Sequence, residues 1–123
     1  MPQLKKLEKR WVFWWKVIFV VALCYFKGVK VVPFCIYRSA EEQNKRFMEG
    51  KSYCDGYKKI SKHQQWLAID FAIPTEDWSD FIWDPIPAYH ILGEVAEKQG
   101  LTWGHRWYEQ GNKKFDDVYH VEL

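Results

Sequence analysis

The chain has 123 residues, which suits one domain of ordinary size and leaves no room for two. Apolar residues make up 48% and charged residues 28%, a balance that excludes an intrinsically disordered chain. The net charge of +2 hides a basic stretch over residues 1–30 and a mildly acidic remainder, so the basic, aromatic-rich stripe of a nucleic-acid-binding protein is absent from the body.

The most apolar stretch comes early, at residues 11–26, and follows four cations at positions 5, 6, 9 and 10. Its sixteen residues would extend about 24 Å as a helix, short of the roughly 30 Å hydrocarbon core of a bilayer. Lys27 and Gly28 then form an ordinary helix end, and no small-residue cleavage site follows. We therefore expect a buried helix over residues 5–27 rather than a membrane anchor; a membrane-tethered protein is the alternative.

The remaining elements follow from hydrophobic periodicity and from helix and strand end signals. Pro33 places the first strand near an edge or a bulge, and Ser39 with Glu42 forms a capping box for the next helix. The order predicts an α+β fold with a small antiparallel sheet and flanking helices. The expected segments are a strand at 29–37, a helix at 40–49, a loop at 51–62, a strand at 67–73, an irregular connection at 75–87, a helix at 88–99, a short strand at 101–103, a loop at 104–116 and a strand at 118–123.

The three cysteines, Cys24, Cys35 and Cys54, are an odd number without Cys-x-x-Cys spacing. This pattern argues against a disulfide framework and favours a reducing compartment for folding. Nothing near them indicates a reactive thiol, so we expect all three to pack in the core.

The first chemical signal is Asp70, which shares a strand face with Ala68 and Ala72. A carboxylate on such an apolar strand is costly unless it is paired or bound to a metal. His63 lies seven residues earlier and can reach Asp70 only if the chain reverses between them. Two interpretations stay open: a metal shared by both residues, or an aspartate salt-bridged to a neighbour with His63 on the surface.

The second signal is His120 on the last strand, with Asp117 three residues earlier. In a regular strand that spacing puts two side chains on opposite faces. Asp117 must therefore lie in the turn entering the strand if both serve one site. The alternative is an acidic turn followed by a histidine facing the core.

Metal-dependent hydrolysis would use both the Asp70 signal and the His120 signal. A catalytic zinc takes three ligands of the His and carboxylate type, keeps one position for water and lowers the pKa of that water. A nearby carboxylate transfers the protons, and a cation stabilises the oxyanion. Arg38 is the candidate cation; its alternative role is surface solvation or a salt bridge with Glu41 or Glu42.

Four segments carry a resemblance to a known family through their order and spacing. The chain resembles the zinc D-alanyl-D-alanine carboxypeptidase (VanY-type) and L-alanyl-D-glutamate endopeptidase family, which includes small phage endolysins and shares its fold with the hedgehog signalling domain. The resemblance covers about residues 13–123. The segments are 37–43 (YRSAEEQ), 50–52 (GKS), 61–70 (SKHQQWLAID), and 103–104 (WG) followed by 117–123 (DVYHVEL).

The resemblance implies a single peptidase domain over residues 1–123 with zinc as its cofactor. Its pattern implies zinc ligands at His63, Asp70 and His120, Asp117 as general base, Arg38 as the group that polarises the scissile carbonyl, and Gln43 and Ser61 near the metal or substrate. Two residues depart from the family pattern: Trp66 and His105 stand where the family usually has glycine.

The expected substrate is a peptidoglycan stem peptide, and the small size favours an endolysin-like L-alanyl-D-glutamate endopeptidase. We expect a monomer made in the cytoplasm and acting on the bacterial cell wall, without nucleic acid or membrane as a partner. The alternatives are a D-alanyl-D-alanine carboxypeptidase and a non-catalytic zinc-binding module of the same fold. A base at Asp117 distinguishes an enzyme from such a module.

Overall fold

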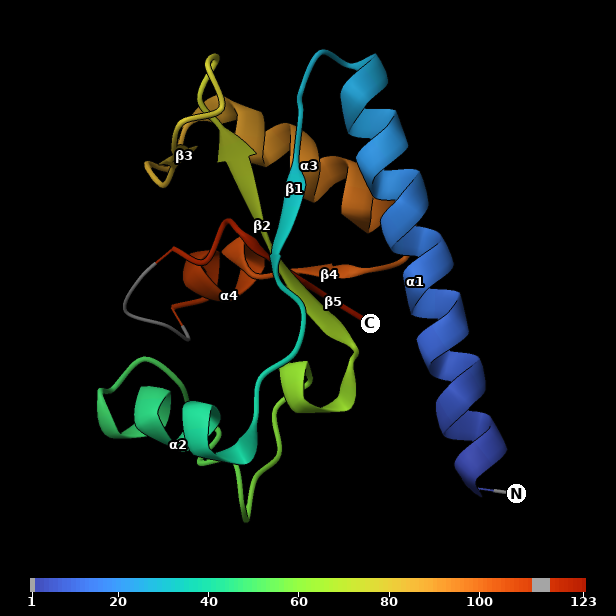
Figure 1. Cartoon of the computed structure of the whole chain (residues 1–123), viewed down its shortest axis with the longest axis vertical. Coiled ribbons are helices and arrows are strands. Elements are labelled where there is room, and N and C mark those ends of the chain that lie inside the picture. The colour runs from blue at the N-terminus through green and yellow to red at the C-terminus, as the bar shows by residue number, and fades with distance from the viewer. Residues whose placement is uncertain (1, 112–115) are drawn as a thin grey trace.

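A small antiparallel sheet lies among helices in the computed structural model, which describes residues 2–111 and 116–123 (Figure 1). This arrangement confirms the predicted α+β fold. The elements are α1 (Pro2–Phe26), β1 (Val32–Cys35), α2 (Ala40–Met48), the 3-10 helix η1 (His63–Gln65), β2 (Ala68–Pro74), β3 (Phe81–Ile82), α3 (Pro87–Lys98), β4 (Thr102–Trp103), α4 (His105–Glu109) and β5 (His120–Glu122).

The strands are ordered β1-β2-β5-β4, and β3 extends the pairing of β2. β2 is therefore the central strand, and its register decides which side chains meet. Asp70 on β2 lies opposite Cys35 on one side and His120 on the other. The register of β1 shifts between Pro33 and Cys35, which confirms the bulge expected near this proline.

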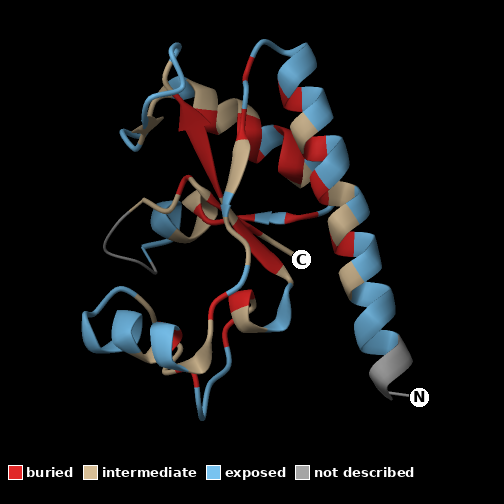
Figure 2. Cartoon of the chain, viewed as in Figure 1, coloured by how far each residue is buried: buried red, intermediate tan, exposed pale blue. Residues whose placement is uncertain are grey.

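One face of α1 builds the core against α3 and the sheet. Phe13, Val17, Val20 and Cys24 recur at helical spacing and are all buried, as the buried stripe in Figure 2 shows. The expected buried first helix is thus confirmed, although it starts earlier than residue 5. Within the described part of the chain, no helix is both long and apolar enough to cross a membrane.

Trp103 connects α3 to the C-terminal segment, by packing on the helix and by a hydrogen bond to the segment. A Cβ on Gly93 of α3 would lie 2.0 Å from the Trp103 ring, so only glycine lets β4 approach this closely. The indole Nε1 of Trp103 donates a hydrogen bond of 2.8 Å to the carbonyl of Val118. This bond fixes the turn between Asp117 and His120.

Two expectations needed correction. β1 covers only residues 32–35 of the strand expected at 29–37, because the bulge and Pro33 interrupt its pairing. β3 and α4 were missed within segments expected to be irregular, since two and five residues are too few to show a period. Residues 112–115 of the expected loop at 104–116 lie outside the described residues.

Candidate metal and active site

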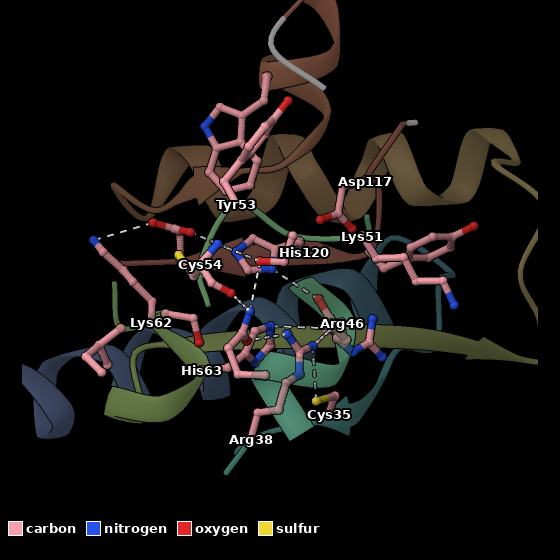
Figure 3. A pocket seen from close by; sticks show the side chains of 18 of the residues that line it. Cys35, Arg38, Arg46, Lys51, Tyr53, Cys54, Lys62, His63, Asp117 and His120 are labelled. Carbon is pink, nitrogen blue, oxygen red and sulfur yellow. Dashed lines mark hydrogen bonds and ion pairs between the residues drawn. The ribbon is translucent and has the colours of Figure 1, made fainter. Parts of the chain in front are cut away.

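One pocket of about 830 Å³ opens beside the central strand (Figure 3). Its walls come from β1, α2, the loop before η1, β2, α4 and the turn into β5. All seven residues predicted for the site line it: Arg38, Gln43, Ser61, His63, Asp70, Asp117 and His120.

A tight reversal carries His63 back over β2. The Ser61 backbone N–H donates to Gln64 Oε1 at 3.0 Å, and the Gln64 N–H donates to Ser61 Oγ at 3.3 Å, which starts η1. His63 Nε2 then lies 3.4 Å from Asp70 Oδ2, and only 3% of the histidine is exposed. The interpretation with His63 on the surface is therefore wrong.

Trp66 ends this reversal with a backbone φ of 61°, in the left-handed region that favours glycine. This conformation explains why a glycine is usual at this point of the pattern. The Trp66 ring stacks on Tyr37, with ring centroids 4.7 Å apart and planes 22° apart. The aromatic pair thus offsets some of the backbone strain of the turn.

Because Trp66 has a positive φ, Trp66→Gly should be more stable than Trp66→Ala by about 1 kcal/mol. Both variants lose the same ring, so their difference isolates the backbone term. Urea unfolding of the two proteins measures it. At exposed Trp11, within α1, the order should reverse, with Ala more stable than Gly by about 1 kcal/mol. The same order at both positions would contradict the strain argument.

Asp70 is the hub of the site, because three cationic or titratable groups surround its carboxylate. Arg38 Nη2 lies 3.2 Å from Oδ2, and His120 Nδ1 lies 3.1 Å from Oδ1, in addition to His63 on Oδ2. Burial alone would raise the pKa of Asp70, but the hydrogen bonds from His120 and His63 outweigh it and hold that pKa well below its ordinary value. Asp70 is therefore an anion over the whole physiological range.

His120 is held by carboxylates on both ring nitrogens. Its Nε2 lies 2.8 Å from Glu122 Oε1, opposite the contact of Nδ1 with Asp70. Burial acts to lower the pKa of His120, but Asp70 and Glu122 outweigh it and raise that pKa above its ordinary value. The sequence prediction missed Glu122, although a residue two positions after His120 on a strand shares its face.

Asp117 lies in the turn that enters β5, as the spacing required. The His120 N–H donates to the Asp117 carbonyl at 3.3 Å. A Cβ on Gly104 would lie 2.5 Å from that carbonyl oxygen and 3.0 Å from the Asp117 Cβ, so glycine is needed where the turn meets the end of β4. The Asp117 carboxylate lines the pocket together with His120 (Figure 3).

Arg38 is buried in the wall of the pocket, with 6% of it exposed. Its Nη1 donates to Gln43 Oε1 at 3.0 Å, and its ion pair is with Asp70 rather than with Glu41 or Glu42. Gln43 is fully buried, and its Nε2 donates to Ser52 Oγ and to the Cys54 carbonyl. Gln43 therefore holds the Arg38 guanidinium in position through its Nη1.

Two of the three cysteines are not core residues. Cys24 is buried as expected, whereas Cys35 and Cys54 are half-buried and line the pocket. Cys35 ends the bulged strand β1, whose register brings it opposite Asp70. Burial raises the pKa of the Cys35 thiol, but His63 and Arg38 outweigh burial and hold the pKa below its ordinary value.

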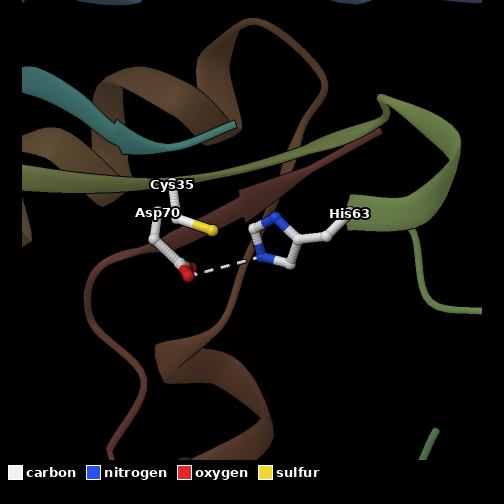
Figure 4. Close-up of side chains that lie close together, drawn as sticks. All are labelled: Cys35, His63 and Asp70. Atoms are coloured by element: carbon white, nitrogen blue, oxygen red, sulfur yellow. Dashed lines mark ion pairs between the residues drawn. The ribbon is translucent and has the colours of Figure 1, made fainter. Parts of the chain in front are cut away.

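The donor atoms in this pocket fit a divalent cation. Cys35, His63 and Asp70 each offer a ligand atom, and these atoms lie within 4.8 Å of one another (Figure 4). The buried His63 makes no close, well-aligned hydrogen bond: its Nε2 has only the long ion-pair contact of 3.4 Å with Asp70 Oδ2, a spacing that a cation bound between the two would account for. His120 approaches the same carboxylate from its other oxygen.

His105, the second departure from the family pattern, is not among the residues that line the pocket. Its Nδ1 lies 2.6 Å from Asp116 Oδ1, and its Nε2 lies 2.9 Å from Glu109 Oε1. The Asp116 contact ties the start of α4 to the segment before β5, and the Glu109 contact lies within α4.

Residues 55–123, more than half of the chain, match the family described as D-alanyl-D-alanine carboxypeptidase. The chain belongs to this peptidase family. The matched range contains His63, Asp70, Asp117 and His120, whereas Arg38 and Gln43 precede it.

Relatives of the chain support the same placement. The chain is 32% identical over 112 aligned residues to the peptidoglycan L-alanyl-D-glutamate endopeptidase CwlK of Bacillus subtilis, covering 79% of this chain and 62% of that protein. It thus spans less than two thirds of this curated relative. Among solved structures, the L-Ala D-Glu endopeptidase ChiX of Serratia marcescens shares the fold with a TM-score of 0.61 and 20% identity, over 86% of this chain and 76% of that one.

Proposed function

We propose that this chain is a zinc peptidase of the bacterial cell wall that cuts peptidoglycan stem peptides between L-alanine and D-glutamate. The observation that carries the proposal is the gathering of His63, Asp70, His120 and Asp117 in one pocket of a peptidase fold. The similarity to a peptidoglycan L-alanyl-D-glutamate endopeptidase supports this choice of bond. Residues 1–123 would act as one peptidase domain around the single core cluster described above.

The metal ligands in this proposal are His63, Asp70 and His120. The burial of His63, its long 3.4 Å contact with Asp70 and the anionic state of Asp70 support this assignment. When bound, zinc supplies a water of lowered pKa and polarises the scissile carbonyl.

The other residues of the pocket move protons and hold the substrate. The Asp117 carboxylate accepts a proton in the pocket and later delivers one to the leaving amine. Arg38 keeps N–H donors beyond those bound by Gln43 and Asp70, and these donors hold the carbonyl oxygen as it becomes an oxyanion. Gln43 and Ser61 serve this reaction through their neighbours, by fixing Arg38 and the turn of His63.

The charges around the pocket suit an acidic peptide. Four cations besides Arg38 line it: Arg46, Lys51, Lys59 and Lys62. A stem peptide that carries D-glutamate presents carboxylates close to the scissile bond, and complementary charge accelerates encounter with such a substrate. A D-alanyl-D-alanine carboxypeptidase would also bind a carboxylate, so the charge supports the substrate class, and the bond cut needs a direct measurement.

Digestion of purified murein followed by mass spectrometry of the fragments tests the proposed function. We expect fragments that begin with D-glutamate and free L-alanine carboxyl groups on the glycan side. Release of D-alanine alone would instead assign the carboxypeptidase activity. No new fragment from a zinc-loaded protein would favour the non-catalytic zinc-binding module.

Chelation should abolish this hydrolysis, and added zinc should restore it, because the pocket would lose its activated water. Fragment release measured in excess chelator, before and after zinc is added back, checks the expectation. Hydrolysis that persists in excess chelator would remove the metal from the mechanism.

Zinc binding should release at least about one proton at pH 7, because Asp70 and Glu122 outweigh burial and raise the pKa of His120 to about 10, and this imidazole must be neutral to ligate. Zinc affinity should therefore fall as the pH is lowered. Calorimetric titrations in buffers of different ionisation enthalpy count the protons. A count of zero would mean that the histidines are already neutral and would contradict the charge assignment.

A further inference from the structure

The sheet register places Cys35 in the pocket, beside ionisable side chains, rather than in the hydrophobic core. It lies directly opposite Asp70, which in turn lies opposite His120, so three neighbouring strands present a thiol, a carboxylate and an imidazole in one row. Residues opposed in this way share a face, with Cβ atoms about 4.5–5.5 Å apart. The bulge after Pro33 brings Cys35 into this row.

His63 closes the group from the side of η1. Its ligand atom and those of Cys35 and Asp70 lie within 4.8 Å of one another, and in Figure 4 the sulfur and the carboxylate both face the imidazole ring. Only 3% of His63 is exposed, and its closest polar contact is the long ion pair of 3.4 Å between Nε2 and Asp70 Oδ2, without a well-aligned hydrogen bond at either ring nitrogen. A buried imidazole that faces a thiol and a carboxylate at such distances has the arrangement of ligands around a cation.

The Cys35 thiol is not committed to another strong contact. Its sulfur lies 3.6 Å from Arg38 Nη2 and 3.9 Å from the Tyr37 carbonyl, both long, weak contacts for a thiol. Cys35 is also half-buried and lines the pocket, so a cation and its solvent can reach it. Cys54 lines the same pocket but does not belong to the ligand group, which makes it a natural control.

We propose that Cys35 is a thiolate ligand of the cation in this pocket, together with His63 and Asp70. A thiolate makes the donor set softer than one of imidazole and carboxylate alone, so the site should prefer zinc, cobalt or cadmium to magnesium, calcium or manganese. The inference rests on the proposed function and adds Cys35 to its three metal ligands, so the cation would need a fifth position for the water that the proposed mechanism uses. It concerns binding and does not require turnover.

Cobalt substitution provides a direct readout of sulfur ligation. Co²⁺ added to the metal-free protein should give a near-ultraviolet thiolate-to-metal charge-transfer band as well as its visible d–d bands. We expect the charge-transfer band in the wild type and in Cys54→Ser, and its loss in Cys35→Ser. Cobalt binding without the band in the wild type, or a band that persists in Cys35→Ser, would overturn the proposal.

Affinity gives a second measure. Loss of a direct ligand should cost at least the roughly 10- to 100-fold in metal affinity that removal of an outer partner costs. Competition with a zinc indicator should show this loss for Cys35→Ser and wild-type affinity for Cys54→Ser. Equal zinc affinity in all three proteins would count against Cys35 as a ligand.

A third measurement needs no variant, so it is independent of folding defects. Iodoacetamide labelling of the wild type, read by peptide mass spectrometry, should slow at Cys35 by about tenfold or more when zinc is bound, because the metal holds the thiolate. Labelling of Cys54 should not change. Equal labelling of Cys35 with and without zinc would overturn the proposal, whereas a cobalt–thiolate band in a protein that leaves murein intact would overturn only the proposed function.

Discussion

Asp117→Asn should lower the rate of murein hydrolysis by roughly two to four orders of magnitude while zinc content stays at the wild-type level. The amide keeps the size of the side chain but cannot accept the proton that the proposed mechanism transfers. Asp117 lines the pocket from the turn before His120 (Figure 3). Rates on purified murein and zinc content by elemental analysis measure the two halves of the expectation.

The neighbouring residue gives a matched control. Asp116 has the same charge but pairs with His105 and is not among the residues lining the pocket. Asp116→Asn should therefore keep hydrolysis within a few-fold of the wild type. Equal losses in the two variants would point to general charge or folding effects, and full activity in Asp117→Asn would remove this carboxylate from proton transfer.

The long elements of the fold could be predicted because each buries a periodic face. The sequence shows the apolar spacing of α1 and α3 directly. It also shows the capping box of α2, in which the Glu42 N–H donates to Ser39 Oγ at 3.1 Å. The spacing of His63 and Asp70 in the sequence already requires the chain to reverse if the two side chains are to meet. The left-handed turn that achieves it, at Trp66, runs against the preference of tryptophan and could not be foreseen from its residue type.

The environment of Cys35 could not be predicted, because it depends on pairing between distant strands. In the sequence this cysteine is one apolar residue of a β-rich stretch, and a core position is the ordinary expectation for it. The register of β1 on β2, shifted by a bulge, instead places it opposite Asp70. A slip of one residue would turn its side chain to the other face of the sheet.

Asp70→Asn should cause the largest loss of stability among substitutions in the pocket, about 3–5 kcal/mol in the metal-free protein. The change removes the carboxylate that Arg38, His63 and His120 share. The histidines can lose their protons, but the Arg38 guanidinium stays charged and is only 6% exposed, so its charge would be left buried and unpaired. Urea unfolding at pH 7 measures the difference.

The pH dependence of this loss separates charge from packing. Because the folded-state pKa of Asp70 lies below its ordinary value of 3.8, its contribution is fully present above that pH and is lost as the pH falls further. The difference in free energy of unfolding between wild type and Asp70→Asn should therefore become smaller below about pH 4. Asp84→Asn, an exposed change two residues after β3, should shift stability by no more than about 0.5 kcal/mol. If this difference in unfolding free energy stayed constant below about pH 4, Asp70 would act through its shape and hydrogen bonds. Its charge would then not hold the three groups together.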